Sequence, residues 1–307
     1  MKYFIYSIQS LTLLMLTPLF IGIIKNFKAA IRGYKGFSVF QPYFDLKKLC
    51  GKGRVISKSS SFITAITPIL CLSACVTVTF LIPVFFNDGN SYFGNLFIII
   101  FLLGIVKFLS SLLGLDSAST FGGMGSSREL FISMFAEPIM FILVAFLYME
   151  TKTFNIFSIT LINAAILKYN IAHIIAAIGF AVLIMAENAR MPVDNPETHL
   201  ELTMIHEGMI LDISGRDLAL MELASYIKLI VFITMFINCF FPLGIASSLN
   251  IVSICVSFIS YILKVLGILV VISIIESNMA KFRLFRIPEL LSAAFSLSLV
   301  AIVINYF

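Results

Sequence analysis

Apolar segments long enough to cross a membrane follow one another along almost the whole sequence. Of its 307 residues 60% are hydrophobic and 12% are charged, whereas about 25% of a soluble domain is charged. A membrane-spanning helix needs about 20 consecutive apolar residues. The segments that qualify are 4–24, 62–86, 95–115, 130–149, 168–186, 223–246, 250–275 and 289–306. We therefore expect an all-α integral membrane protein, with residues 1–307 forming a single polytopic membrane domain of about eight transmembrane helices.

Two apolar segments allow a second interpretation. Segment 4–24 has the position of a secretory signal, but its apolar run is too long and no small-residue cleavage site follows it cleanly, so we interpret it as a true span. Residues 154–167 are apolar but short. They form either an interfacial helix or an extension of the fifth span.

Lysine and arginine are concentrated on one side of the predicted bundle. If the eight spans alternate in direction, the first, third, fifth and seventh connections hold fifteen of the 21 basic residues. The other side receives only Lys2, Lys152 and Lys168. Because cytoplasmic connections carry an excess of basic residues, we place these four connections in the cytoplasm. The protein then lies in the cytoplasmic (inner) membrane, with both termini on the side away from the cytoplasm.

Half of the acidic residues gather in the long connection between spans 5 and 6, residues 187–222. They are Glu187, Asp194, Glu197, Glu201, Glu207, Asp212, Asp217 and Glu222, accompanied by Arg190 and Arg216. One interpretation is a set of exposed ion pairs, which contribute little to stability. The other is a group of crowded carboxylates that raise one another's pKa and pass protons along. The spacing alone favours neither interpretation.

Local spacing in this connection predicts a helix and a set of ion pairs. Asn195-Pro196-Glu197 supplies an N-cap residue, a proline in the first turn and an acidic residue beside it, which predicts a helix over 196–211. Glu187 ends the fifth span, where a negative charge opposes the helix dipole. We expect Arg190 to pair with Glu187 and with Asp194.

Four further ionisable residues lie within the spans: Lys107, Glu137, Lys228 and Lys264. A charge at the bilayer centre costs at least about 2.5 kcal/mol, so such residues are functional candidates. Lys107 and Glu137 lie near span ends, where a long side chain can reach polar surroundings. Lys264 lies deep, and we expect it to pair with a carboxylate such as that of Glu137.

Other motifs for cofactors or catalysis are weak. The five cysteines form no Cys-x-x-Cys pair, so we expect no metal and no cofactor bound by this chain, and no catalytic residue of its own. The stretch GGMGSS at 122–127 lacks the phosphate-loop pattern, and we interpret it as a flexible glycine-rich turn.

Four stretches of the sequence, in order, carry a family resemblance. They are QPYFDLKKL (41–49), LDSASTFGGMGSSRELFISMFAEP (115–138), AENARMPVDNPETHLELTMIHE (186–207) and ESNMAKFRLFRIPELL (276–291). Together they resemble the membrane subunit shared by respiratory complex I and the membrane-bound group 4 [NiFe]-hydrogenases, including formate hydrogenlyase and hydrogenase-4 complexes. In the acidic stretch, Val193 and Asn195 stand where complex I versions tend to have Phe and Leu. This form is more similar to the hydrogenase-type subunits.

The resemblance implies a membrane-anchor and coupling subunit of an electron-transport complex, with iron–sulfur clusters and a [NiFe] centre in partner subunits. It implies a path for protons or sodium through Glu187, Arg190, Asp194, Glu197, Glu201, Glu207, Asp212, Arg216, Glu137, Lys228 and Lys264. It implies docking of a peripheral arm by Gln41, Asp45, Asp116, Arg128 and Glu129. The expected partners are the large and small hydrogenase subunits, iron–sulfur proteins, antiporter-like membrane subunits and the lipid bilayer, with no nucleic acid.

Two alternatives stay open at this point. A complex I-type subunit would use the same residues around a quinone headgroup, although the first connection lacks the proline that the complex I pattern has before Gln41. A self-contained ion or solute transporter is a different class, typically built from inverted repeats with broken helices near the midplane. The sequence shows no self-similar halves and no matched glycine or proline breaks.

Overall fold

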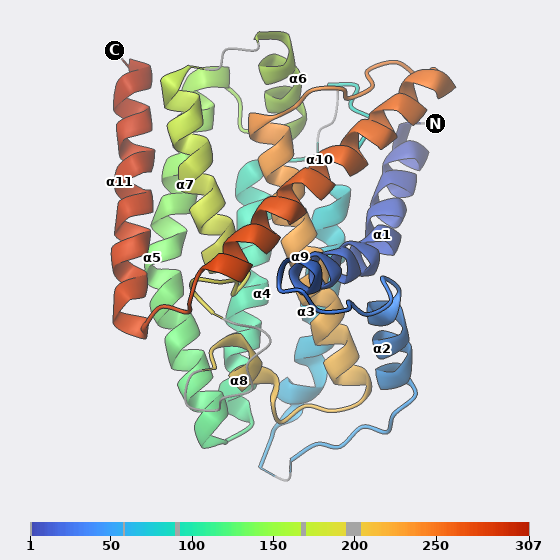
Figure 1. Cartoon of the computed structure of the whole chain (residues 1–307), viewed down its shortest axis with the longest axis vertical. Helices are drawn as coiled ribbons and strands as arrows, with labels where there is room; N and C mark the ends of the chain where they lie inside the picture. Colours follow the sequence, from blue (N-terminus) through green and yellow to red (C-terminus); the bar gives the residue numbers. More distant parts are fainter. Residues whose placement is uncertain (1, 58, 90–92, 167–169, 195–203, 307) are drawn as a thin grey trace.

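The computed structural model describes residues 2–57, 59–89, 93–166, 170–194 and 204–306, which are almost entirely helical (Figure 1). The α-helices are α1 (Lys2–Ile31), α2 (Gln41–Cys50), α3 (Phe62–Phe80), α4 (Leu96–Asp116), α5 (Thr120–Thr151), α6 (Ile156–Ile166), α7 (Ile171–Glu187), α8 (His206–Ile210), α9 (Arg216–Phe240), α10 (Ile251–Asn278) and α11 (Ile287–Tyr306). The described part of the chain contains no β-strand. The expectation of an all-α protein is confirmed.

Seven helices among the described residues are long and apolar enough to cross a membrane: α1, α3, α4, α5, α9, α10 and α11, the last counted from Leu284. The fifth predicted span is occupied by α7, an apolar helix of 17 residues. The chain is therefore a multi-pass membrane protein. The number of eight crossings stays a prediction.

Several helices begin or end well outside the apolar segment that predicted them. α1 continues through basic residues to Ile31, and α5 begins at Thr120 rather than at 130. α9 begins at Arg216, within the acidic connection, and ends at Phe240 rather than at 246. Hydropathy marks the part of a helix that faces apolar surroundings, whereas backbone hydrogen bonding continues as far as capping and packing allow.

The glycine-rich stretch 122–127 is helical, so the prediction of a flexible turn is wrong. A Cβ on Gly122 would lie 2.4 Å from the carbonyl oxygen of Gly114, and one on Gly125 would lie 2.8 Å from the carbonyl oxygen of Ile205. These glycines therefore allow the first turns of α5 to pack closely against the end of α4 and the start of α8.

The apolar segment 154–167 forms a separate short helix, α6, at the end of the bundle that also carries both termini (Figure 1). α6 ends at Ile166, and Asn170 has an extended backbone with ψ of 152° before α7 begins at Ile171. The segment is therefore not an extension of the fifth span.

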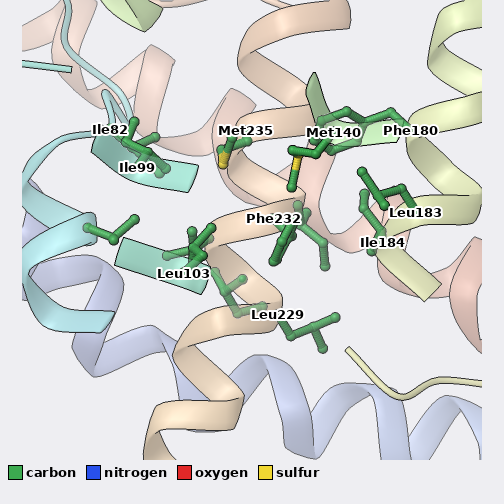
Figure 2. Packing of buried hydrophobic residues seen from close by; sticks show 14 of the residues in the cluster. Ile82, Ile99, Leu103, Met140, Phe180, Leu183, Ile184, Leu229, Phe232 and Met235 are labelled. Carbon is green, nitrogen blue, oxygen red and sulfur yellow. The ribbon is translucent and has the colours of Figure 1, made fainter. Parts of the chain in front are cut away.

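α9 is the central helix of the bundle. It packs against α1, α2, α3, α6, α7 and α10, while α11 lies against α5 and α7. Figure 2 shows side chains of α4, α5 and α7 converging on α9, where Leu103, Met140 and Leu183 lie around Phe232. α10 crosses the face of the bundle obliquely and packs mainly on α1 (Figure 1).

The first, third, fifth and seventh connections meet at one end of the bundle, which we call the connection end. The contacts include an ion pair of Arg54 with Asp217 at 2.5 Å, a hydrogen bond from the Ser61 hydroxyl to Asp116 at 2.6 Å and one from the Phe282 N–H to the Pro192 carbonyl at 2.9 Å. Both termini and α6 lie at the opposite end, the terminal end (Figure 1). These contacts agree with the prediction that the four basic connections share one side, and the cytoplasmic orientation stays a prediction.

Candidate functional site: a buried ion-pair cluster at the connection end

Glu187, the last residue of α7, lies between two lysines of other helices. Its carboxylate accepts a hydrogen bond from Lys107 Nζ of α4 at 2.8 Å, and Lys228 Nζ of α9 lies 3.3 Å from its other oxygen. Lys228 Nζ also donates to the backbone carbonyl of Glu187 at 2.7 Å. A negative charge is unfavourable at a helix C-terminus, and Glu187 is only 9% exposed. The two ammonium groups therefore offset both the helix dipole and the loss of water.

Glu129 of α5 completes a group of four, Lys107, Glu129, Glu187 and Lys228, which we call the Glu187 cluster. Its carboxylate lies 3.8 Å from Lys107 Nζ, so one ammonium group stands between two carboxylates. The four residues come from four helices and balance two negative with two positive charges. Because a buried charge without a partner is strongly destabilising, each member depends on the others.

The chain leaves α7 through a turn that sends Arg190 away from Glu187. Ala189 adopts a positive φ of 47°, and the Arg190 N–H donates to the Met185 carbonyl at 2.9 Å. This is the hydrogen-bond pattern of a helix C-terminus closed by a left-handed residue. The turn ends the axis of α7 and directs Arg190 toward α10.

Arg190 pairs with Glu276 of α10, so the prediction that it pairs with Glu187 and Asp194 is wrong. Its guanidinium lies 3.4 Å from the Glu276 carboxylate. Lys28 of α1 forms an ion pair with the same carboxylate, which is 1% exposed. A buried acid on α10 thus binds α1 and the start of the acidic connection together.

Asp194 holds together the two described parts of the acidic connection, and it also pairs with the seventh connection. Lys281 Nζ lies 2.5 Å from one carboxylate oxygen. The other oxygen accepts hydrogen bonds from the N–H groups of Ile205 and His206, at 3.2 and 3.3 Å. The predicted helix over 196–211 is only partly tested, because residues 195–203 lie outside the described residues. Residues 204 and 205 are not helical, and the helix observed there is α8, which begins only at His206.

A cavity of about 680 Å³ joins these groups. Its lining includes Lys107, Glu129, Glu187 and Lys228 at one part, and Lys25, Tyr226, Glu222, His206 and Glu207 at another. The connection residues Arg190 and Asp194 also line it. Ionisable side chains from α1, α4, α5, α7, α8 and α9 therefore border one enclosed space.

The structure brings together part of the predicted ion path. Glu187, Arg190, Asp194, Glu207 and Lys228 all line the cavity. Asp212 and Arg216 do not line it, and both are exposed, Asp212 between α8 and α9 and Arg216 as the first residue of α9. Glu197 and Glu201 lie outside the described residues.

Lys264 does not pair with a carboxylate among the described residues, so that prediction is wrong. Its Nζ donates to the carbonyl oxygens of Phe241 at 3.3 Å and Leu243 at 2.5 Å, just past the end of α9. Carbonyls at a helix C-terminus attract a cation, which satisfies the ammonium group without an acid. Glu137 is exposed on a different face, on α5.

The residues predicted to dock a peripheral arm make intrachain contacts. Asp116 caps the start of α3 by accepting hydrogen bonds from the N–H groups of Ser61 and Thr64, at 3.0 and 3.1 Å. Gln41 donates to Asp45 within α2 at 2.9 Å, and Arg128 donates to the Met204 carbonyl at 2.9 Å. Glu129 belongs to the Glu187 cluster. These contacts shape the surface of the connection end, and docking stays a prediction.

Several charged residues that shape the site were absent from the predicted path: Lys28, Lys107, Glu276 and Lys281. Each lies at or near the end of a span. A lysine at a span end is common, because it sets the orientation of the span or reaches polar surroundings with its long side chain, so it does not by itself indicate a site. Glu276 and Lys281 fall within the stretch ESNMAKFRLFRIPELL. The signal that the sequence offered was an acidic residue directly after a span, because a carboxylate that becomes buried requires a partner.

The described part of the chain contains no group of three or more His, Cys, Asp or Glu side chains that is able to hold a metal ion. What the fold presents instead is a polytopic helical membrane bundle with buried ion pairs around a cavity at one end. The chain belongs to the NADH dehydrogenase family, which matches residues 5–306.

Known relatives agree with this family and with the resemblance seen in the sequence. The chain is 32% identical to hydrogenase-4 component C of Escherichia coli (strain K12) over 302 residues, 95% of this chain and 92% of that protein. It is 27% identical to formate hydrogenlyase subunit 4 of the same organism over 298 residues, 96% of each chain. A chain in the solved structure of the membrane-bound sulfane sulfur reductase (MBS), an archaeal respiratory membrane complex, shares the fold with a TM-score of 0.83 at 16% identity, covering 99% of this chain and 100% of that one.

Proposed function

We propose that this chain is the membrane-anchor and coupling subunit of a multi-subunit respiratory hydrogenase of the hydrogenase-4 or formate hydrogenlyase type. It lies in the cytoplasmic membrane with the acidic connection on the cytoplasmic side. Partner subunits carry the iron–sulfur clusters and the [NiFe] centre, and antiporter-like subunits continue the membrane arm. The similarity to hydrogenase-4 component C supports this assignment.

The observation that carries the coupling role is the Glu187 cluster beside the cavity. Lys107, Glu129 and Glu187 are buried, and the Lys228 side chain is 12% exposed. Ionisable groups inside membrane-spanning bundles are by default functional candidates. Each carboxylate of the cluster has an ammonium group within 4 Å. A sodium ion there would be repelled by Lys107 and Lys228, whereas a proton can be exchanged along hydrogen bonds such as that from Lys107 to Glu187. The transported ion is therefore the proton, and electrons reaching a docked partner change the charge balance of the cluster.

A complex I-type quinone site is the second candidate. The cavity of about 680 Å³ falls in the range of small-molecule sites, which is about 300–1,000 Å³. Reduction of added quinone by the intact complex, with electrons from its own donor, would favour this candidate over the first.

Glu187→Gln in the native complex tests the coupling role. We expect hydrogen production from an artificial electron donor to persist, and proton movement in inverted membrane vesicles to fall at least tenfold. Asp217→Asn is the matched control, because Asp217 is a paired acid at the same end that does not line the cavity. If Glu187→Gln fails to assemble, Glu129→Gln repeats the test at the more weakly paired carboxylate. Wild-type proton movement in an assembled variant would contradict the proposal.

A further inference from the structure

A second, smaller hollow opens between α4 and α5, on the side of the Glu187 cluster away from α1. Its volume is about 260 Å³. Apolar side chains form most of its lining: Ile100, Phe101, Leu103, Ile105, Phe108, Met140, Phe141 and Phe232. Lys107, Glu137 and Glu187 also line it. The hollow thus joins the buried cluster to an apolar outer face of the bundle, and we call it the α4–α5 groove.

Glu137 places a carboxylate on this outer face. It is exposed, and among the described residues no hydrogen bond or ion pair reaches it, although Lys107 interacts with it electrostatically. Apolar neighbours such as Phe108 and Met134 are exposed around it. Because α5 runs from Thr120 to Thr151, Glu137 lies near the middle of the helix and not near its end, as the sequence suggested. A carboxylate surrounded by lipid chains is strongly unfavourable, so this face requires a polar partner.

A backbone acceptor lies on the same face. Pro138 is inside α5 and has no N–H to donate to the carbonyl four residues earlier, at Met134. Met134 and Glu137 are three residues apart, so they share one side of the helix. In lipid each unsatisfied backbone group is costly. One turn of α5 therefore carries both an exposed carboxylate and a carbonyl without its usual helical donor.

The α4–α5 groove also has room for a neighbour. A Cβ built on Gly104, which lines the groove, meets no atom within 4 Å. Small residues at such positions let a second transmembrane helix approach closely. The groove thus combines space and apolar walls with the Glu137 carboxylate.

We infer that the α4–α5 groove seats a transmembrane helix of another membrane subunit of the complex, and that this helix presents a hydrogen-bond donor to Glu137. This inference rests on the proposed function, because the partner helix would belong to the proposed complex and would lie beside the Glu187 cluster. Charge complementarity selects the occupant. A lipid chain brings no donor. A second copy placed symmetrically would bring a second Glu137, an acceptor facing an acceptor.

Photocrosslinking in native membranes tests the occupant. Phe108, which is 58% exposed at the groove, is replaced by photoreactive benzoylphenylalanine. Ile259 of α10, which is 57% exposed, receives the same probe as the control. We expect position 108 to crosslink to a different polytopic subunit and position 259 to give lipid adducts. Lipid adducts alone at 108, or a crosslink to a second copy of this chain, would overturn the inference.

A steric pair of variants gives an independent measurement. Gly104→Leu fills the groove, whereas Gly267→Leu adds the same side chain on α10, where a Cβ also meets no atom within 4 Å. We expect the partner subunit that co-purifies with the chain to fall at least tenfold in Gly104→Leu only, and a wild-type amount in that variant would contradict the docking. Glu129→Gln, at a residue of the Glu187 cluster that does not line the groove, should leave the crosslink at 108 intact. A persistent crosslink together with wild-type proton movement in Glu129→Gln would reject the coupling role and retain the docking site.

Discussion

The two ends of the bundle are fastened by different chemistry. At the connection end, buried ion pairs hold the segments together, as in Lys107 with Glu187 and Lys28 with Glu276. At the terminal end, neutral amides bind the backbone. Gln9 Oε1 accepts hydrogen bonds from three consecutive N–H groups, those of Val84, Phe85 and Phe86, at 2.9–3.1 Å.

Other loops of the terminal end follow the same rule. Asn87 donates to the Phe157 carbonyl at 2.8 Å, and Asn238 donates to the Pro83 carbonyl at 2.7 Å. A titratable pair at this end is His173 with Glu150, whose atoms lie 3.1 Å apart between α7 and α5. Amides satisfy buried backbone groups without a charge to desolvate. The chain therefore has a neutral way to fasten loops, beside the ammonium group of Lys264 that binds the carbonyls of Phe241 and Leu243. The buried ion pairs of the connection end support the proposal that charges there have a role in coupling.

Among the variants that test this difference between the two ends, Lys107→Met should have the largest effect on stability. It removes the ammonium group that stands between Glu129 and Glu187, and breaking a buried pair costs about 3–5 kcal/mol. We expect a large fall in the thermal midpoint of the detergent-purified complex. Lys107→Met combined with Glu129→Leu should recover part of the loss, because Glu187 keeps Lys228 and the carboxylate that Lys107→Met leaves unpaired is then gone. A double variant as unstable as the single one would show that charge pairing does not explain the effect.

A smaller effect should follow from Gln9→Leu at the terminal end. The change leaves three backbone N–H groups without their acceptor, and a buried unsatisfied group costs about 1–3 kcal/mol. The thermal midpoint should fall, while proton movement per assembled complex stays at the wild-type value. Vesicle assays normalised to the amount of complex provide the measurement. Reduced proton movement per complex would mean that the two ends do not differ in role.

Hydropathy was sufficient to predict the helices of the bundle but not their ends. Apolar runs located α3, α4 and α11, because lipid-facing and core-facing residues are both apolar. The ends of α5 and α9 were missed, since polar turns continue these helices beyond the apolar segment. The glycines at 122–127 were misread for a related reason: a helical packing contact with Gly114 is invisible in local sequence.

The charged pairs were the least predictable part of the site. Sequence reasoning grouped Glu187, Arg190 and Asp194 with one another because they are neighbours in the chain. Their partners lie 80, 86 and 87 residues away. Sequence spacing identifies which side chains need a partner but not which helices the fold brings beside them. Glu276 and Lys281 fall in one of the four stretches that carry the resemblance, yet neither was part of the predicted path.

The smallest effect should come from Arg54→Ala, which removes an ion pair at the surface of the connection end. Arg54 Nε lies 2.5 Å from Asp217, which is buried, but the arginine side chain is 39% exposed. Water can reach the Asp217 carboxylate once the arginine is removed, and pairs open to solvent contribute about 0–1 kcal/mol. The thermal midpoint should change little, and the difference from wild type should shrink further in high salt, which screens exposed charges. Arg54→Lys keeps the charge and should match wild type more closely. A loss as large as that of Lys107→Met would remove the distinction between surface pairs and the Glu187 cluster, and with it the argument that burial sets the cluster apart.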